Sequence, residues 1–331
     1  MFSKSSLHEH HRRVIRGENA GVALITALGM LVLFLAMGTA FLGYVTIDQR
    51  DARYALKMAR AKAVADGGAR AAIGEIQAAL AAGKPAPPEL TIPSSVYGFE
   101  KGQDTPVPQE NRAARAEVRI TDEWARINLN QAPVVVLQAI LGVDGDAARK
   151  LRSGLPRQDS GEVLAPTSDR RWLTTVGDLV TRGLMEGPTY NALDQELVTV
   201  YSAADNTNPG AYINLNTAPA KVLAAVLNLS PEAANAVVAA RDKAPFKSVQ
   251  DLRAAVGKGP ETFNVPQAPG APDALPPALA FSSRCYRIRS EAKVANVVDE
   301  KEVDATRWSV EAVVYFPDGA APLVQYWSAA K

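Results

Sequence analysis

Apolar residues run without interruption from Gly21 to Ile47, where the sequence GVALITALGMLVLFLAMGTAFLGYVTI holds no charge over 27 positions. A helix crosses a bilayer with about 20 apolar residues. A secretory signal would end in a small-residue cleavage site after an apolar region of only about 7–15 residues, and no A-x-A site closes this one. The segment therefore predicts a membrane helix that stays with the protein.

The pattern after this apolar run remains helical. Residues 48–82 are rich in Ala, Arg, Lys and Glu, with apolar residues at spacings of three and four. The simplest interpretation is one helix over 22–82, roughly 90 Å long at 1.5 Å per residue, with a transmembrane part (22–47) and an amphipathic part (48–82). The alternative is a membrane helix joined to a separate helix at Gly67-Gly68.

Strict alternation of apolar and polar residues follows a Pro/Gly-rich loop at 83–110. The segment RAEVRIT (115–121) has the pattern of a half-buried strand, so 83–126 is assigned to a loop and the first strand of a sheet. Near the C-terminus, YRIRSEAKV, RWSVEAVVYF and LVQYW predict three more strands within 281–331. The sheet thus begins before residue 125 and resumes after 280, with something helical inserted into it.

The inserted region, 127–256, contains an internal repeat. INLNQAPVVVLQAIL (127–141) matches INLNTAPAKVLAAVL (213–227), and TTVGDL further on aligns with KSVQDL. The offset between the copies falls from 86 to 73 residues, so the first copy carries 13 extra residues, which we place around 154–170. We infer a duplication.

The copies lie near 127–180 and 213–256, and each is predicted to form a strand end, a helix, a hairpin and further helices. Thr175-x-x-Asp178 and Ser248-x-x-Asp251 fit the capping-box pattern. A stretch crowded with Pro, Gly and Ala (257–280) is predicted to return the chain to the sheet as a surface loop.

The polar positions of the repeated motif are assigned structural roles. Asn130 and Asn216 suit helix caps, and Pro133 and Pro219 suit a first helical turn, where the missing N–H costs little. The structural residues of the two copies are accordingly Asn128, Asn130, Pro133, Asn214, Asn216 and Pro219.

The INLN-x-AP-xx-VL pattern resembles helix-hairpin-helix modules, including those of competence DNA receptors. In the DNA-binding form, glycine amides of the hairpin reach a phosphate. Here the first hairpin, GVDGD (142–146), places two carboxylates at that point, and the second, NLSPE (228–232), has no glycine and loses an N–H to proline. Both changes oppose phosphate binding, so a structural use of the modules is favoured over nucleic-acid binding.

The composition excludes most kinds of catalytic site. All three histidines lie in the first 11 residues, so Ser-His, Cys-His and histidine-metal sites are excluded from the main body. Cys285 is the only cysteine and is interpreted as a small apolar residue at a strand start. No P-loop or GxSxG motif is present, and 36 basic residues balance 35 acidic ones. We expect no enzyme, no cofactor and no small-molecule substrate.

Calcium is the one metal left open by the composition. The acidic pair Asp144/Asp146 and the cluster Asp299/Glu300/Glu302 offer oxygen ligands. Solvated surface charge is the preferred interpretation of both, because the sequence has no EF-hand loop.

The leader, residues 1–21, is basic. Positive charge before a first span tends to stay in the cytoplasm, which predicts that the bulk of the chain lies on the other side of the membrane. Residues 48–62 are also basic on balance, which weakens this inference.

Taken in order, the features resemble those of the K component of the general secretion pathway, a minor pseudopilin of type II secretion systems. They are GVALITAL, the long helix, the strand leading into ARINLN, the duplicated INLN-x-AP modules, LVTVYSA and SRCYRIRSEAKV. The resemblance implies an α+β fold, in which a pilin-like N-terminal helix packs on an antiparallel sheet. Into that sheet a large all-α domain of two helix-hairpin-helix-like repeats is inserted.

The resemblance also implies a processing site. Prepilin peptidase would cut between Gly21 and Val22 and leave Val22 as an N-methylated terminus. Family leaders usually place Arg or Lys directly before the glycine, whereas here four residues, Gly17 to Ala20, separate Arg16 from Gly21. Gly17 is therefore an alternative site, but cutting there would place a glutamate at the head of the membrane helix.

In most pilins the fifth mature residue is a glutamate that pairs with a neighbouring subunit's terminal amine. Here the position is Thr26, and the K component likewise lacks the glutamate. An unpaired carboxylate in hydrocarbon is costly, so its absence suits a subunit with nothing above it.

The function expected from this resemblance is assembly. The chain would cap and help initiate a short pseudopilus with other minor pseudopilins, anchored in the inner membrane with its head in the periplasm. The main rival is a membrane-anchored DNA-uptake or type IV pilus tip component that uses the paired modules, and a hydrolase is a distant third.

Overall fold

The computed structural model describes residues 5–92, 114–155, 172–201, 212–256, 278–298 and 301–330, with side chains described from residue 21 onward. The chain divides into two units, residues 1–60 and 61–331. Helix α1 (Ser5–Ala81) contributes to both.

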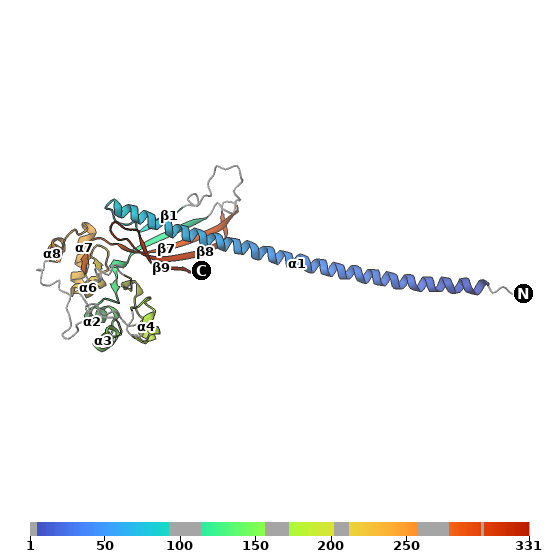
Figure 1. Cartoon of the computed structure of the whole chain (residues 1–331), viewed down its shortest axis with the longest axis horizontal. Helices are drawn as coiled ribbons and strands as arrows, with labels where there is room; N and C mark the ends of the chain where they lie inside the picture. The colour runs from blue at the N-terminus through green and yellow to red at the C-terminus, as the bar shows by residue number, and fades with distance from the viewer. Residues whose placement is uncertain are drawn as a thin grey trace. The chain divides into compact units, whose positions relative to one another are not determined.

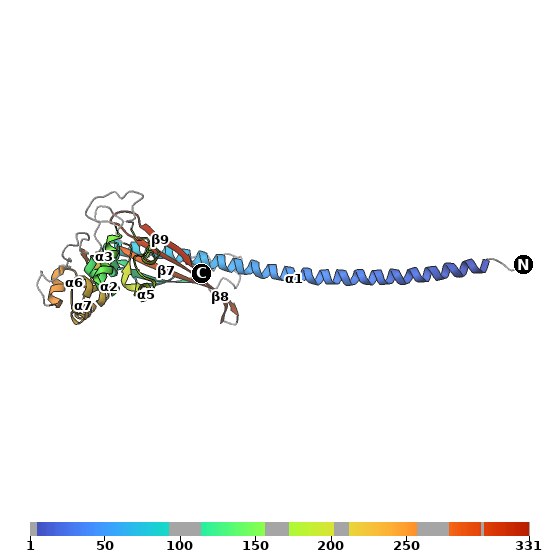
Figure 2. The same ribbon diagram turned by 90° about the horizontal axis from the view of Figure 1, so that it is seen from below.

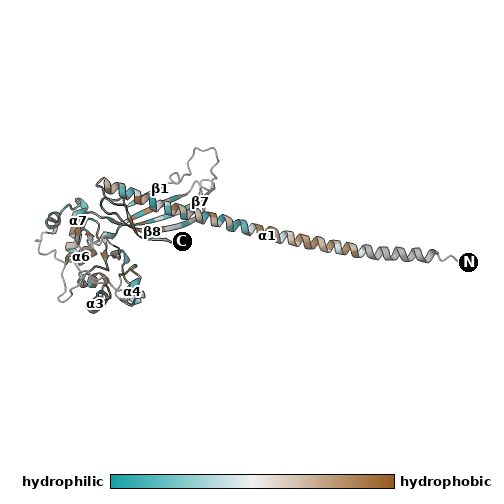
Figure 3. Ribbon diagram, in the orientation of Figure 1, coloured by the Kyte–Doolittle hydropathy of each residue, from teal (hydrophilic) through white to brown (hydrophobic). Residues whose placement is uncertain are grey.

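The first unit is the N-terminal part of α1. Its apolar side chains from Val22 to Ile47 are exposed, and Figure 3 shows them as a continuous apolar stretch of the helix. By length and composition, α1 is able to cross a membrane. The helix begins at Ser5, earlier than the predicted start at Val22, because the leader contains no proline and its residues continue the helix.

The double glycine does not interrupt α1. Gly67 and Gly68 lie inside the continuous helix, so the alternative of two separate helices is wrong. The reason is tertiary packing, because the helix on either side of this pair is buried against the sheet at Val64, Ala65 and Ala69.

The second unit is built on a five-stranded antiparallel sheet with the order β1-β2-β7-β8-β9 (Figure 1). The strands are β1 (Glu89–Ile92), β2 (Arg115–Asp122), β7 (Cys285–Val298), β8 (Lys301–Tyr315) and β9 (Leu323–Ala330). Strand β1 lies inside the segment predicted as a loop. Its four residues are too short for an alternation pattern to stand out.

One face of the sheet packs on α1. The helix contributes apolar residues at spacings of three and four, namely Ala61, Ala65, Ala69, Ala72 and Ile76. The sheet contributes the apolar positions that alternation predicts, including Val118 and Ile120 on β2 and Ile288 on β7. Figure 2 shows this end of α1 running along the strands. The opposite face of the sheet carries the charged positions.

The insertion between β2 and β7 is helical. It contains α2 (Val134–Leu141), α3 (Gly145–Ser153), α4 (Asp178–Thr181), α5 (Gly187–Asn191), α6 (Ala220–Leu227), α7 (Pro231–Lys243) and α8 (Val249–Val256). Two short 3-10 helices, η3 (Glu123–Ala125) and η4 (Gln195–Leu197), complete it. Both copies share a single apolar core, in which α2 packs on α6, and their helices lie together at one end of the sheet in Figure 1.

Each copy also contains a two-stranded parallel pair. Strand β3 (Ile127–Asn128) pairs with β4 (Val198–Thr199), and β5 (Tyr212–Asn214) pairs with β6 (Ala278–Ala280). Strand β6 corrects the prediction of a loop over 257–280 at its last three residues. Residues 257–277 lie outside the described part of the chain.

Candidate functional site: the duplicated module and its junction with the sheet

The repeated asparagines hold distant backbone segments together. In the first copy the Asn128 carboxamide oxygen accepts from the Asn130 N–H at 2.9 Å, which closes a tight turn. The Asn130 side chain exchanges two hydrogen bonds with the backbone of Leu173 (2.8 and 3.0 Å) and donates to the Val200 carbonyl at 3.2 Å. One buried carboxamide thus joins three parts of the chain.

The second copy reproduces this arrangement. Asn214 accepts from the Asn216 N–H at 3.1 Å, and Asn216 exchanges hydrogen bonds with the backbone of Phe246 at 2.8 and 2.9 Å. Asn216 also donates to the Phe281 carbonyl at 2.8 Å. Leu173 and Phe246 are therefore equivalent, as are Val200 and Phe281.

The structure corrects the capping roles of the motif. Asn130 and Asn216 do not cap a helix. The N-cap residues of α2 and α6 are Pro133 and Pro219, with extended backbone and no side-chain cap. Because both asparagines point back into the fold, their carboxamides satisfy backbone groups that are buried with them.

An arginine in each copy, buried in the first and half-buried in the second, was missed by the sequence analysis. Arg152 on α3 donates to the Asn130 carbonyl at 2.8 Å, and Arg241 on α7 donates to the Leu215 carbonyl at 2.9 Å. Burial lowers the pKa of Arg241, and the nearby Asp242 opposes this effect. The two arginines do not align at either of the offsets that relate the copies, because α3 has 9 residues and α7 has 13.

The extra residues of the first copy lie in its second half. Asn130 and Leu173 are 43 residues apart, whereas the equivalent Asn216 and Phe246 are 30 apart, a difference of 13. The offset is still 86 at the helix caps Asp144 and Ser230 and has fallen to 73 at Leu173 and Phe246, so the insertion falls between Asp144 and Leu173. Residues 156–171 in this interval lie outside the described part.

The hairpins between the helices are closed in the same way in both copies. Gly142 and Asn228 are equivalent left-handed residues that end α2 and α6, with φ of 64° and 50°. Asp144 then caps α3 by accepting from the Ala147 N–H at 2.8 Å, and Ser230 caps α7 through the Ala233 N–H. Each hairpin thus places a side-chain acceptor of its own at the start of the second helix, and in the first copy that acceptor is a carboxylate, which opposes a phosphate there.

The aspartates of the predicted capping boxes bind backbone amides. Asp251 accepts from the N–H groups of Lys247 and Ser248 at 2.8 and 3.0 Å, while the Ser248 hydroxyl accepts from the Asp251 N–H. In the first copy Asp178 binds both amides and both hydroxyls of Thr174 and Thr175. The reciprocal half of the box is lost there because the Thr175 hydroxyl donates rather than accepts.

Asp122, the last residue of β2, holds the second copy. Its carboxylate accepts from the Asn214 carboxamide at 2.8 Å and the Thr217 hydroxyl at 2.6 Å. It also accepts from the Trp124 N–H at 2.8 Å and so caps η3. Burial raises the pKa of Asp122, and hydrogen bonds from Ser283 and its other donors oppose that rise.

Glu123, the next residue, holds the first copy. Its fully buried carboxylate accepts from the Thr199 hydroxyl on β4 and pairs with Arg287 on β7 at 2.6 Å. Arg126 lies 3.5 Å from the same carboxylate and also pairs with Glu196. Arg287 in turn pairs with Glu311 at 3.1 Å, so a chain of charges joins the sheet to the first copy.

Aromatic residues cover the same junction. Trp124 stacks on Tyr212 with ring centroids 4.4 Å apart, beside the buried Cys285. Tyr201 packs against Tyr326 of β9 at 5.7 Å, and desolvation raises the pKa of Tyr201 to about 12. The sheet face opposite α1 is therefore apolar at this end. Cys285 begins β7, and burial raises the pKa of its thiol.

The predicted processing residues lie in the first unit, in the exposed apolar part of α1. No atom lies within 4 Å of a Cβ added at Gly21, and Val22 is exposed. The Thr26 hydroxyl donates to the carbonyls of Val22 and Ala23, each at 3.0 Å, so its polar group is satisfied within its own helix.

The candidate calcium ligands do not come together among the described residues. In the described part of the chain, no three or more His, Cys, Asp or Glu side chains are grouped so that they could hold a metal ion. Asp144 caps α3, and Asp146 pairs with Arg149 on the same helix. Asp299, Glu300 and the side chain of Glu302 lie outside the described part.

Comparison with known proteins gives a match to a family model and a similarity to a solved structure. Residues 213–268 match the model of the family described as "Type II secretion system (T2SS), protein K". The chain is also similar to a chain in the crystal structure of the GspK-GspI-GspJ complex from the type 2 secretion system of enterotoxigenic Escherichia coli. The similarity has a TM-score of 0.50 and 15% identity, and covers 86% of this chain and 99% of that one. The resemblance to protein K is confirmed.

The fold class is confirmed with it, as a long N-terminal helix on an antiparallel sheet with additional helices. The family match covers the second copy of the module, and the fold match covers most of the chain. No curated protein matches the sequence.

Proposed function

We propose that this chain is a minor pseudopilin that caps and helps initiate the pseudopilus of a type II secretion system. The observation that carries the proposal is the protein K match over residues 213–268, in a chain whose N-terminal helix is long and apolar enough to span a membrane. The role is structural rather than catalytic. Its partners are other minor pseudopilins, and the solved relative is itself named as part of a complex with GspI and GspJ.

The proposal includes processing and location. Prepilin peptidase cuts between Gly21 and Val22, Val22 is N-methylated, the helix remains in the inner membrane and the second unit lies in the periplasm. The basic leader supports this orientation. The exposed backbone around Gly21, with no other part of the described chain nearby, supports access by a peptidase.

The position of the subunit at the tip is supported by Thr26. Because its hydroxyl is satisfied by the Val22 and Ala23 carbonyls, the helix enters lipid without an unpaired polar group. A subunit with another subunit above it would use a charge there to neutralise that neighbour's terminal amine. This chain offers none.

The first test is mass spectrometry of the N-terminus of the membrane-extracted protein, with and without co-expressed prepilin peptidase. A peptidase-dependent, methylated start at Val22 is expected. A start at Glu18 would move the site to Gly17. An intact leader under both conditions would contradict the proposal and favour the DNA-uptake alternative, whose own sign would be salt-dependent DNA binding.

The tip position has a separate test in Thr26→Glu, with Thr26→Ser as the matched control. The Thr26→Glu variant should keep its fold but should no longer support secretion or co-purify with minor pseudopilins, because an unpaired carboxylate in lipid is costly. Unchanged secretion and complex formation would remove the physical support for a tip position.

A further inference from the structure

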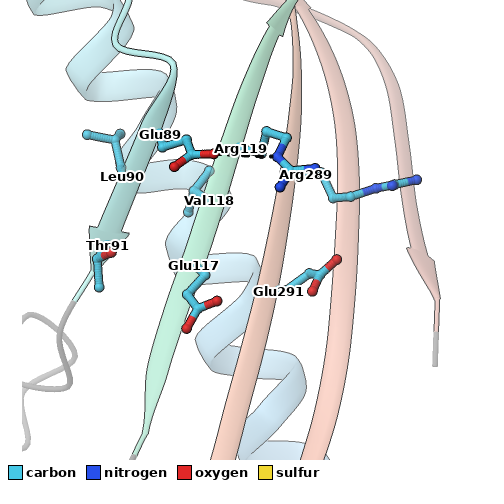
Figure 4. A pocket seen from close by; sticks show the side chains of 8 residues that line it. All are labelled: Glu89, Leu90, Thr91, Glu117, Val118, Arg119, Arg289 and Glu291. Carbon is cyan, nitrogen blue, oxygen red and sulfur yellow. Dashed lines mark ion pairs between the residues drawn. The ribbon is translucent and has the colours of Figure 1, made fainter. Parts of the chain in front are cut away.

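Several charged side chains on the sheet face opposite α1 pair with one another. Arg119 lies 3.7 Å from Glu89, and Figure 4 shows this pair in the shallow pocket between β1, β2 and β7. Arg289 lies 3.1 Å from Glu311. Since these pairs lie within the chain, they need no charged partner from outside.

Two arginines of α1 differ from these pairs. Arg50 and Arg53 are exposed, and within the described part of the chain neither makes an ion pair. Arg70, further along the same helix, pairs with Asp66 at 2.9 Å across one turn. No acidic residue stands three or four positions from Arg50 or Arg53, so the helix itself cannot pair either of them.

The neighbours of these arginines on the helix surface are themselves basic. With 3.6 residues per turn, Arg50, Arg53 and Lys57 fall within about 60° of one another. Asp48 and Asp51 lie on the other side of the helix. Like charges three or four positions apart destabilise a helix. The basic side of α1 therefore carries unmet positive charge at Arg50 and Arg53.

The position of the two arginines along α1 indicates what they meet. The uncharged run ends at Ile47, and Figure 3 shows α1 changing from hydrophobic to hydrophilic along its length. At 1.5 Å per residue, Arg50 and Arg53 stand about 4.5 and 9 Å beyond Ile47. The headgroup layer on each side of a bilayer is about 5–8 Å thick, and a long arginine side chain extends toward it. Both guanidinium groups thus reach the lipid phosphates.

The length of the apolar run favours a contact on one side of the helix. Its 27 residues are roughly 40 Å long, whereas the hydrocarbon core is about 30 Å thick, so the helix fits the core when it is tilted. A tilted helix turns one side of its next turns toward the headgroups and the other side toward water. Basic residues on one side and acidic residues on the other suit that arrangement in either leaflet.

We propose that Arg50 and Arg53 form a binding site for the phosphate groups of anionic phospholipids at the end of the membrane span. The inference rests on the proposed function only for the span itself. A guanidinium donates two parallel hydrogen bonds to a phosphate, and each basic residue near an anionic membrane surface adds to the attraction. The bound lipids hold this end of the span in the headgroup layer and fix the depth of α1.

The test uses the full chain reconstituted into phosphatidylcholine vesicles that contain a trace of spin-labelled lipid. Electron spin resonance measures how much labelled phosphatidylglycerol the protein immobilises, relative to labelled phosphatidylcholine. The wild type should prefer phosphatidylglycerol at low salt, and the preference should weaken as salt rises. Arg50→Gln combined with Arg53→Gln should lower the preference about fivefold at low salt.

Two matched variants test whether the position of the charge matters. Lys221→Gln combined with Lys243→Gln removes the same charge from exposed positions of the insertion and should leave the preference unchanged. Asp48→Asn combined with Asp51→Asn, on the other side of α1, should not lower it. An equal loss in the lysine variant would make the preference an effect of net charge and would overturn the inference.

The remaining outcomes separate this inference from the proposed function. A wild-type chain that carbonate extracts from the vesicles has no membrane span, which would overturn the proposed function and this inference together. Equal preference in the wild type and the arginine variant would overturn the inference alone. If that variant keeps its lipid preference but no longer co-purifies with minor pseudopilins, the arginines bind an acidic surface of a partner subunit instead of lipid.

Discussion

The two copies of the module use the same polar contacts but are fastened to the sheet by different residues. Asn130 and Asn216 each bind three backbone groups, and Gly142 and Asn228 end equivalent helices in the left-handed conformation. The first copy, however, is tied to the sheet through buried Glu123, and the second through Asp122.

This difference shows what a duplication retains. The contacts inside a module are kept because they satisfy buried backbone groups that every copy has. The contacts that place the module are free to differ, since each copy meets a different part of the sheet. Adjacent carboxylates at the end of β2 thereby give each copy its own attachment.

The largest expected effect is a loss of unfolding free energy that differs between the two attachments. Glu123→Ala removes the fully buried carboxylate that pairs with the partly buried Arg287, and breaking such an ion pair costs about 3–5 kcal/mol of unfolding free energy. Asp122→Ala removes hydrogen bonds from Asn214 and Thr217 and should cost less, about 1–3 kcal/mol. Denaturant unfolding of the detergent-solubilised chain measures both, with Glu186→Gln, at an exposed position of the insertion, as the control. Equal costs would contradict the distinction.

The next largest effect is the unfolding free energy lost when the asparagine contact that both copies share is removed. Asn130→Ala should cost about 3 kcal/mol, because it orphans backbone groups of Leu173 and Val200 in a fully buried setting. Asn216→Ala should cost about 2 kcal/mol, since its surroundings are only partly buried. Asn191→Ala, at an exposed position, serves as the reference in the same unfolding experiment. A larger cost at Asn216 would argue against burial as the source of the difference.

The smallest effect is a pH dependence. Burial tends to raise the pKa of Asp178, but the bonds from Thr174 and Thr175 outweigh it and lower that pKa below 3.8. The Lys247 N–H, followed by the Ser248 N–H, likewise lowers the pKa of Asp251. A lowered folded-state pKa stabilises the fold above the unfolded value, and this is lost as pH falls through the folded pKa.

Asp178→Ala and Asp251→Ala should therefore lower the thermal midpoint by about 2 °C at pH 7. Scans between pH 7 and pH 2.5 should show each variant converging with the wild type below about pH 4. Differences that do not narrow as the pH falls would locate the effect in side-chain packing rather than in the charge of the carboxylate.

Much of the fold could be predicted, since alternation marks the long strands and apolar content marks the membrane part of α1. The short strands β1 and β6 could not, because three or four residues carry no periodicity of their own. The repeat was visible because the INLN motif is locally encoded. The hydrogen-bond partners of its asparagine side chains could not be predicted, because Leu173 and Val200 are 43 and 70 residues away from Asn130.

The junction escaped prediction for the same reason. Glu123 is one acidic residue in a polar stretch, and nothing near it in the sequence indicates that Arg287, 164 residues further on, is its partner. The charge pattern of the outer strand faces was evident, but which rows face each other depends on the register of β2 with β7.

The pairing of β2 with β7 across the whole insertion also sets an order of folding. Strand β2 has no neighbour on one side until the chain has been made as far as Cys285. The helical insertion makes many contacts of short sequence separation, which form quickly. Once folded, it brings the ends of the long intervening segment together and removes most of the entropy of closing that loop. We therefore expect the insertion to fold first and to hold β2 and β7 close enough to pair. A destabilised module would then slow the folding of the sheet or cause the chain to aggregate.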